Sequence, residues 1–178
     1  WYENDGSESF TEHAISTAAD AACSVHAADV DGDGDMDVLS VLRSHGQDGS
    51  HEVAWYENDG SEGFTEHVIS TSDKKFQSVY AADVDGDGDM DVLSASFSDD
   101  KIAWYENDGS ESFTEHVIST DGAQDVYAAD VDGDGDMDVL SASNHDDKIA
   151  WYEQDGSPAQ TATYVPDDNF EQALIDFG

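Results

Sequence analysis

The sequence is very poor in basic residues. Lysine and arginine together number 5 among 178 residues, against 43 aspartates and glutamates, and the formal net charge is −38. A surface of this sign repels polyanions, so we expect neither nucleic acid nor an anionic membrane as a partner. Self-repulsion also destabilises a compact chain, which predicts a protein that attracts cations and works in a salty or calcium-rich medium.

Cysteine and long apolar segments are also scarce. Cys23 is the only cysteine, so no disulfide can form within the chain. No apolar run approaches the roughly 18 residues of a membrane-spanning helix, and we expect no membrane insertion. The sequence shows no secretory leader and no initiator methionine. Because it begins inside a block that recurs later, we expect it to be a fragment of a longer protein.

The common catalytic signatures are absent as well. The sequence contains no G-x-S-x-G, no H-E-x-x-H and no phosphate-binding loop, so we predict that this chain is not an enzyme and assign no catalytic residue. A catalytic site is normally singular, which favours a structural role for the recurrent carboxylates Glu57, Glu106 and Glu153. The recurrent histidines occur once per repeat, too far apart to share a zinc ion, so we expect a structural or surface role for His13, His67 and His116.

The most informative pattern that is present is a run of aspartates. The nine residues D-V-D-G-D-G-D-M-D occur three times, as loop 1 (29–37), loop 2 (83–91) and loop 3 (130–138). Five carboxylates in nine residues repel one another unless a cation lies among them, and Ca²⁺ binds six to eight oxygens at about 2.3–2.6 Å. The alternative is a solvated acidic turn. Three copies that retain every aspartate and glycine favour the metal site.

The spacing predicts how such a loop binds metal. If the first aspartate is position 1, carboxylates fall at positions 1, 3, 5 and 9, position 7 can offer its carbonyl, and glycine at position 6 tolerates a positive φ. This matches the first half of an EF-hand loop, but position 12 is serine, so position 9 must close the site. We predict about one Ca²⁺ per loop, three in all. The candidate ligands are Asp29, Asp31, Asp33, Asp35 and Asp37; Asp83, Asp85, Asp87, Asp89 and Asp91; and Asp130, Asp132, Asp134, Asp136 and Asp138.

Internal repeats predict the fold class. The block W-Y-E-N-D-G begins at Trp1, Trp55 and Trp104 and returns as W-Y-E-Q-D-G at Trp151, a period of about 50 residues. Each period contains four short segments of strand composition bounded by Asp, Gly and Ser clusters, and Asn-Asp-Gly-Ser is a strong hairpin signal. Four strands at this period are typical of a β-propeller blade. In the second unit we predict strands at Ser78–Val84, Met90–Ser96 and Ile102–Glu106, with the fourth at Phe64–Ser70 or its later copy Phe113–Ser119.

The repeats also suggest a domain organisation. We predict an all-β propeller fragment over residues 1–156, with a half blade at 1–17 and blades at about 18–71, 72–120 and 121–156. A linker at 157–165 and a short C-terminal helix in 166–178 would begin a further domain. Propellers typically close with four to eight blades. Three and a half blades form an incomplete ring, so the expected partners include the remaining blades of the parent chain, or a second copy through self-association.

The motif D-V-D-G-D-G-D-M-D-V-L together with W-Y-E-N-D-G resembles the FG-GAP-like (VCBS-type) repeat of bacterial secreted proteins. These repeats are relatives of the calcium-binding blades in integrin α-subunits. The resemblance covers residues 1–156 and implies a β-propeller with one Ca²⁺ per blade, held between the first two strands by the carboxylates at positions 1, 3, 5 and 9 and the carbonyl at position 7. The F-G…G-A-P signature of integrin blades is absent. The end of the chain, from Val165, is similar to segments that open leucine-rich-repeat regions in bacterial surface proteins.

Two functions remain open on these grounds. The first is a non-catalytic calcium-binding module of an extracellular bacterial protein, secreted or on the cell surface, that presents a scaffold for adhesion to a protein or glycan ligand. The second is a lectin-like, carbohydrate-binding propeller or an accessory module of an extracellular polysaccharide-degrading enzyme. The Trp-Tyr pairs bear on this choice, because they could form a sugar-binding platform or pack between blades.

Overall fold

The computed structural model describes residues 1–45, 50–72, 75–98, 100–144 and 147–154. These residues form thirteen β-strands in antiparallel sheets, and they contain no helix. The prediction of an all-β chain is therefore confirmed. The linker and the helix predicted beyond residue 156 lie outside the described residues. Among the described residues, no helix is long and apolar enough to cross a membrane.

The strands form four sheets in chain order. The first sheet is a hairpin of β1 (Tyr2–Asn4) and β2 (Phe10–Glu12). The second contains β3 (Ser24–Ala28), β4 (Asp37–His45), β5 (Ser50–Asn58) and β6 (Phe64–Ser72). The third contains β7 (Phe76–Ala82), β8 (Asp91–Ser96), β9 (Lys101–Asn107) and β10 (Phe113–Ser119). The fourth contains β11 (Asp125–Ala129), β12 (Asp138–Ser143) and β13 (Lys148–Tyr152).

Each sheet is a simple meander in which every strand pairs with the next one along the chain. The pairing is the same in successive repeats: Leu39 lies opposite Trp55 in the second sheet, and Leu93 lies opposite Trp104 in the third. Equal register follows from equal sequence, because a shift of one residue would turn every apolar side chain to the other face.

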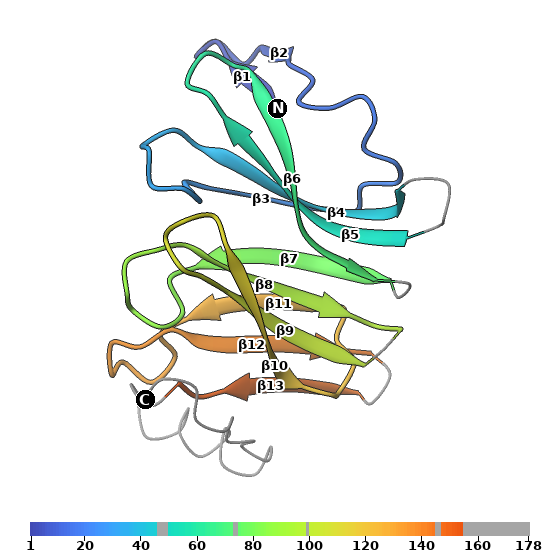
Figure 1. The fold of residues 1–178 in the computed structure, drawn as a ribbon, viewed down its shortest axis with the longest axis vertical. Coiled ribbons are helices and arrows are strands. Elements are labelled where there is room, and N and C mark those ends of the chain that lie inside the picture. The colour runs from blue at the N-terminus through green and yellow to red at the C-terminus, as the bar shows by residue number, and fades with distance from the viewer. Residues whose placement is uncertain (46–49, 73–74, 99, 145–146, 155–178) are drawn as a thin grey trace.

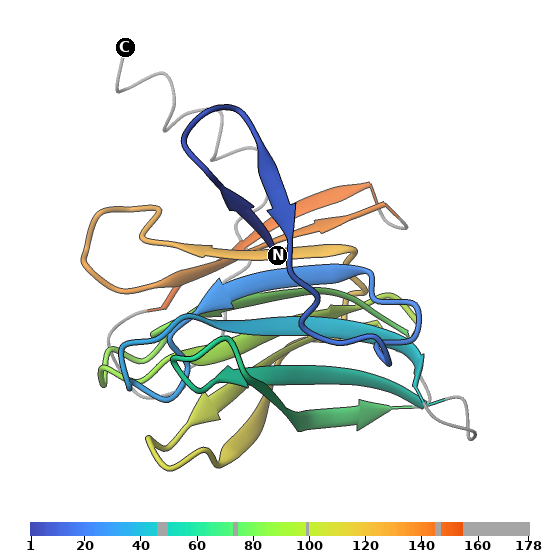
Figure 2. The ribbon, with the colours of Figure 1, turned by 90° about the horizontal axis from the view of Figure 1, so that it is seen from above.

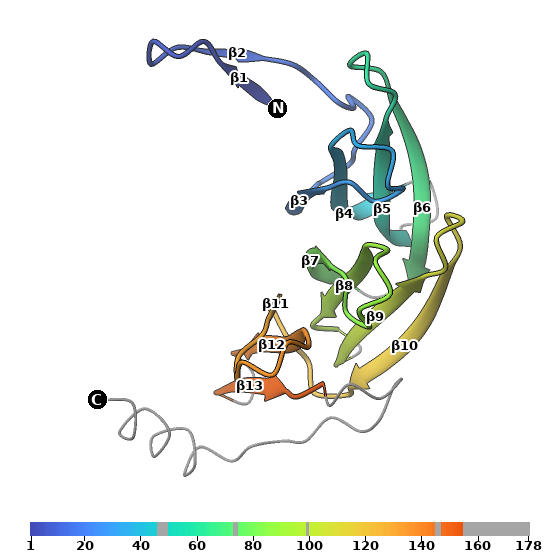
Figure 3. The ribbon, with the colours of Figure 1, turned by 90° about the vertical axis from the view of Figure 1, so that its left-hand side faces the viewer.

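The sheets follow one another along an arc (Figure 3). On the inner side of the arc the first strand β7 contacts both β3 and β11, and β6 and β10 lie on its outer side. All three Asp loops lie at the same edge of the stacked sheets, on the left in Figures 1 and 2. The fold therefore gathers fifteen aspartates along one side of the molecule.

The hydrophobic core lies between the sheets. Trp55 of the second sheet and Tyr105 of the third belong to one buried cluster, and Trp104 of the third sheet and Tyr152 of the fourth belong to the next. Neighbouring residues of a strand point to opposite faces, so each W-Y pair sends its tryptophan toward one neighbouring sheet and its tyrosine toward the other. Trp55 and Trp104 are buried, and these two side chains are packing residues and not a sugar platform.

Candidate metal centres

Each Asp loop joins the first strand of a sheet to the second: β3 to β4, β7 to β8 and β11 to β12. Position 9 is the first residue of the second strand in all three sheets. The glycine at position 6 has a φ of 98° in loop 1 and 102° in loops 2 and 3, a conformation that side chains rarely adopt. The glycine thus has the role that the spacing predicts, which is to turn the chain tightly around the loop.

Every loop brings three carboxylates together. In each group, one oxygen from every residue lies within 4.8 Å of the others, close enough to share one cation. Positions 1 and 3 take part in all three groups, with position 5 in loop 1 and position 9 in loops 2 and 3. The groups are Asp29, Asp31 and Asp33; Asp83, Asp85 and Asp91; and Asp130, Asp132 and Asp138.

The carboxylate at position 1 bears most directly on whether a cation fits. Its Oδ2 accepts a hydrogen bond from the backbone N–H of the glycine at position 6. The N···O distance is 3.1 Å in loops 1 and 2 and 3.2 Å in loop 3. The other oxygens, Asp29 Oδ1 and Asp83 Oδ1, are buried and have no hydrogen-bond partner among the described residues. A buried, unpaired carboxylate oxygen is costly. A divalent cation in each of these two loops would give the buried oxygen a partner, so the loop residues fit such an ion.

Position 9 has a second role that the sequence reasoning missed. Its side chain is fully buried. Its two oxygens each accept a hydrogen bond from a backbone N–H group, one from the valine at position 2 and the other from the residue that follows W-Y-E. In loop 2 these bonds run from Val84 at 2.9 Å and from Asn107 at 2.8 Å to Asp91. The same pair of bonds occurs at Asp37 and at Asp138. Position 9 therefore fastens the loop to the end of the third strand.

The side chain at position 7 packs against a neighbouring turn and not within its own loop. A Cβ built on Gly60 would lie 2.4 Å from Asp35 Oδ2, and one built on Gly109 would lie 2.5 Å from Asp89 Oδ2. These side chains therefore lie against the Asn-Asp-Gly turn that joins the third and fourth strands. That position 7 offers its backbone carbonyl to a metal ion stays a prediction.

The electrostatics of the loops show an uncompensated negative charge. Burial raises the pKa of Asp91 to about 6, although the amides of Asn107 and Val84 act in the opposite direction. Burial also raises the pKa of Asp31 and of Asp85, and repulsion from neighbouring carboxylates adds to the effect in both. Hydrogen bonds from backbone amides therefore do not fully stabilise the ionised carboxylates. A bound cation would stabilise the ionised form further and lower these pKa values.

The recurrent histidines form a repeated structural unit. His67 stacks on Trp55 with ring centroids 4.6 Å apart, and its Nε2 lies 2.7 Å from Glu57 Oε2. His116 repeats the arrangement, stacking on Trp104 at 4.7 Å with its Nε2 2.6 Å from an oxygen of Glu106. These contacts join the third and fourth strands of a sheet and support the structural role expected from the recurrence.

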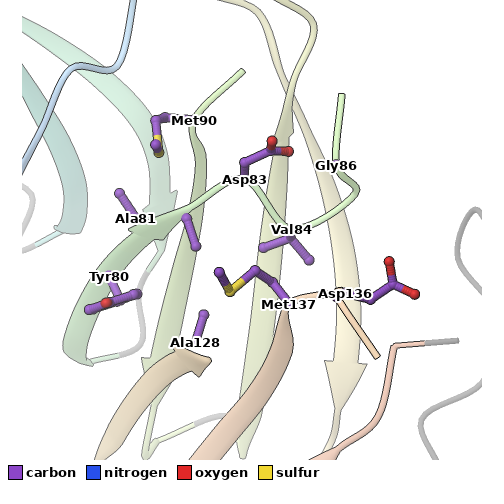
Figure 4. A pocket seen from close by; sticks show the side chains of 11 residues that line it. Tyr80, Ala81, Asp83, Val84, Gly86, Met90, Ala128, Asp136 and Met137 are labelled. Carbon is purple, nitrogen blue, oxygen red and sulfur yellow. The ribbon is translucent and has the colours of Figure 1, made fainter. Parts of the chain in front are cut away.

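A cavity of about 370 Å³ lies between the third and fourth sheets, beside loops 2 and 3 (Figure 4). Tyr80, Met90 and Met137 line it together with Asp83 and Asp136. Tyr80 also belongs to a row of rings along the inner strands, with centroids 4.2 Å from His26 and 4.4 Å from Tyr127. The cavity thus combines an aromatic ring, apolar side chains and carboxylates.

Comparisons with known proteins identify related repeats. A model of the FG-GAP-like repeat matches residues 1–40, 41–94, 84–141 and 130–177. No curated protein matches the chain. A solved structure of an Agrocybe aegerita lectin, described as recognising non-reducing terminal N-acetylglucosamine, is similar over 93% of this chain, with a TM-score of 0.56 and 15% identity. The chain spans 45% of that lectin's length, and at this identity the likeness concerns the fold alone.

Two aspartates of the loop 2 carboxylate group differ in what else they hold. Asp91 also accepts hydrogen bonds from the backbone amides of Val84 and Asn107, whereas Asp85 accepts one only from Asp87 within the loop. Asp91→Ala leaves two buried amides without an acceptor, and we expect it to destabilise the protein by about 2–4 kcal/mol even in a chelator. Asp85→Asn, at position 3, should change stability little in a chelator and reduce the stabilisation gained from Ca²⁺. Denaturant unfolding of both variants, with and without chelator, measures the difference. Equal behaviour of the two variants would contradict it.

The hairpin glycines provide a second test. Gly109→Ala places a Cβ against the Asp89 carboxylate, whereas Gly6, at the same place in the first hairpin, has nothing within 4 Å of an added Cβ. Both have a positive φ, so each alanine variant loses about 1 kcal/mol of stability from the backbone. Gly109→Ala should lose roughly 1–3 kcal/mol more through overpacking. Thermal unfolding compares them, and an equal loss of stability would show that Asp89 does not pack on the turn.

Proposed function

The chain belongs to the FG-GAP-like repeat family, and we propose that it is a non-catalytic, calcium-binding β-propeller module of an extracellular protein. In this proposal the four sheets are successive blades of a ring that further blades of the parent chain, or a second copy, complete. The module is a scaffold for adhesion to a protein or glycan ligand at a bacterial cell surface or on a secreted protein.

The observation that carries the proposal is the grouping of carboxylates in three equivalent loops. Each loop gathers three carboxylate oxygens within 4.8 Å, and two loops contain a buried carboxylate oxygen without a hydrogen-bond partner among the described residues. Three of the four described basic side chains interact elsewhere: Arg43 with Gln77, Lys101 with Glu115 and Lys148 with Asp121. The charge in the loops therefore has no partner from these three basic side chains.

The donor set favours Ca²⁺ over other ions. Every candidate ligand is an oxygen, which excludes the sulfur and nitrogen sites typical of Zn²⁺ and Cu⁺. Four carboxylates and a carbonyl give five or more ligands from a flexible loop, as Ca²⁺ accepts, whereas Mg²⁺ demands a near-ideal octahedron and retains several waters. A bound ion would supply positive charge to the loop. Positions 1 and 3 would hold it, together with position 5 in loop 1 and position 9 in loops 2 and 3.

The extracellular assignment rests on charge and on calcium. The three loops hold 15 of the 43 acidic residues, so three divalent ions would offset only a small part of the net charge of −38. The rest requires screening by salt, because like charges on a compact protein repel. Such a surface suits a calcium-rich medium outside the cell.

Calorimetric titration of chelator-stripped protein tests the proposal. We expect about three Ca²⁺ per chain, much weaker binding of Mg²⁺, and a rise in thermal stability as the loops fill, because a ligand that binds only the folded state stabilises it. Circular dichroism in parallel would show whether β-structure is gained on binding. Absence of Ca²⁺ binding with the full β-signal already present would reject the metal sites.

The cavity in Figure 4 favours a second candidate, a carbohydrate-binding propeller or an accessory module of an extracellular polysaccharide-degrading enzyme. Sugar sites combine an aromatic ring with a few polar groups, and Tyr80 with Asp83 and Asp136 offers that combination. The fold likeness to a lectin supports this candidate. The buried Trp55 and Trp104 do not, so Tyr80 is the aromatic residue on which it depends.

A glycan array probed in calcium tests this candidate, with N-acetylglucosamine-terminated glycans included. We expect binding to be lost in Tyr80→Ala, because the ring is the only aromatic side chain among the residues that line the cavity. Tyr2→Ala is the matched control, since Tyr2 is exposed on the first hairpin and does not line the cavity. No binding by the wild-type protein, or equal loss in both variants, would reject the glycan site.

A further inference from the structure

The side chain of Asn107 bridges two Asp loops that belong to different sheets. Asn107 ends β9 in the third sheet, and its Nδ2 donates to the carbonyl of Val30 at 3.0 Å, in loop 1 of the second sheet. The same Nδ2 donates to the carbonyl of Met90 at 3.1 Å, in loop 2. From these contacts we propose that Asn107 couples the metal sites of loops 1 and 2, so that an ion in one loop raises the affinity of the other; this inference rests on the proposed metal binding.

The orientation of the Asn107 amide follows from its partners. Both groups near Nδ2 are carbonyl oxygens, which only accept hydrogen bonds. The group near Oδ1 is the backbone amide of Gly109, at 3.2 Å, which only donates. Both N–H donors and the carbonyl oxygen of the side chain are therefore used. The reverse orientation would place the oxygen against two acceptors and the NH2 group against a donor. The residue is 2% exposed, so water does not compete for these bonds.

The bridge reaches ligand-bearing groups on both sides. In loop 2, the backbone amide of Asn107 donates to Asp91 Oδ1 at 2.8 Å, which holds a candidate ligand. In loop 1, the carbonyl of Val30 belongs to the peptide that leads directly into the ligand Asp31. The amide of Val30 donates to Asp37 Oδ2 at 2.9 Å, which closes the connection to position 9 of loop 1. A continuous, buried set of hydrogen bonds thus joins Asp37 to Asp91.

Coupling follows if filling a loop fixes these groups. An empty loop leaves its carboxylates repelling one another, whereas a bound cation draws the grouped carboxylates together, at positions 1, 3 and 5 in loop 1 and positions 1, 3 and 9 in loop 2, and fixes the peptides between them. Ordering loop 1 fixes the Val30 carbonyl, which in turn holds Asn107 and the Asp91 carboxylate in place. A second ion then binds a loop that is already ordered. Allosteric couplings of this kind are typically about 5–150-fold in affinity and are reciprocal.

The other junction supplies an internal comparison. Val84 of loop 2 packs in the core between the third and fourth sheets, as Val30 does in the core before it. The residue that corresponds to Asn107 in the fourth sheet is Gln154, whose backbone amide donates to Asp138 Oδ1 at 2.9 Å. The described residues show no hydrogen bond from the Gln154 side chain to loop 2. Loops 2 and 3 therefore lack the bridge, and we expect loop 3 to bind independently.

Site-resolved calorimetry of the full chain tests the proposal. Loop 3 is disabled throughout by Asp132→Asn and Asp134→Asn, and loop 1 is disabled in half of the samples by Asp31→Asn and Asp33→Asn. We expect loss of loop 1 to weaken Ca²⁺ binding at loop 2 by about fivefold or more. In Asn107→Ala this difference should vanish. In Asn58→Ala it should persist, because Asn58 bonds to Met36 and to Gly60 in its own sheet and makes no bond to another loop.

Hydrogen exchange gives a readout that does not depend on affinity. In the variant with loops 1 and 3 disabled, Ca²⁺ added to loop 2 should slow exchange at the Val30 amide, and Asn107→Ala or Asn107→Gln should abolish the slowing. Asn107→Gln mirrors Gln154 and keeps a polar side chain if the alanine variant does not fold. Sites that bind with equal affinity whether or not loop 1 is disabled would overturn the coupling and leave metal binding intact. No Ca²⁺ binding at any loop would overturn both.

Discussion

The structure depends on how the repulsion within each Asp loop is offset. Hydrogen bonds from backbone amides offset part of this repulsion. The carboxylate at position 1 accepts one from the glycine at position 6, and the carboxylate at position 9 accepts two from other parts of the repeat. They do not complete it, because Asp91 retains a pKa raised to about 6 and Asp29 and Asp83 each keep a buried oxygen without a partner. The described groups therefore leave part of the negative charge of each loop without compensation. If a cation binds there, as proposed, its binding and the closure of the β-hairpin that begins each sheet belong to one equilibrium.

The need for neighbouring sheets has an equally simple origin. A single meander of three or four strands has two apolar faces and cannot bury either by itself. Each W-Y pair serves both faces, and burial of Trp55 and Tyr105 requires the second and third sheets together. Stability in such an arrangement is close to a sum of interfaces between neighbours. At the two ends of the arc Trp1 is 43% exposed and Ile149 is 81% exposed. In the proposed ring, further blades or a second copy would pack on these surfaces.

The sequence predicted what depends on spacing within one repeat. The four strands of the second unit, the hairpin at Asn107 to Ser110 and the tight turn at position 6 all follow from local chemistry, and the structure contains each of them. The ligand assignments remain a prediction. The structure brings together nine of the fifteen candidate aspartates in three groups.

What the sequence did not predict depends on the registry between strands. The bond from the Asn58 amide to Asp37 exists because β4 and β5 pair Val38 with Tyr56, which no spacing within the loop reveals. The contact of Asp35 with Gly60 likewise requires the turn between β5 and β6 to fold over loop 1. A signal was present in the repeats, because glycine follows Asn-Asp in each W-Y-E-N-D-G block. Its meaning becomes clear only when the loop and the turn are seen to touch.

The three Asp loops have the same sequence but different surroundings. Loops 1, 2 and 3 have the same nine residues, yet only the junction between the second and third sheets places an asparagine amide where it reaches both loops. At the next junction, glutamine adds one methylene, so its amide lies farther from the backbone that carries it. The difference between asparagine and glutamine at this position, outside the metal loop, would decide whether two sites respond together. If the two sites couple as proposed, the residue that sets how they communicate lies in the neighbouring repeat and not in the Asp loop itself.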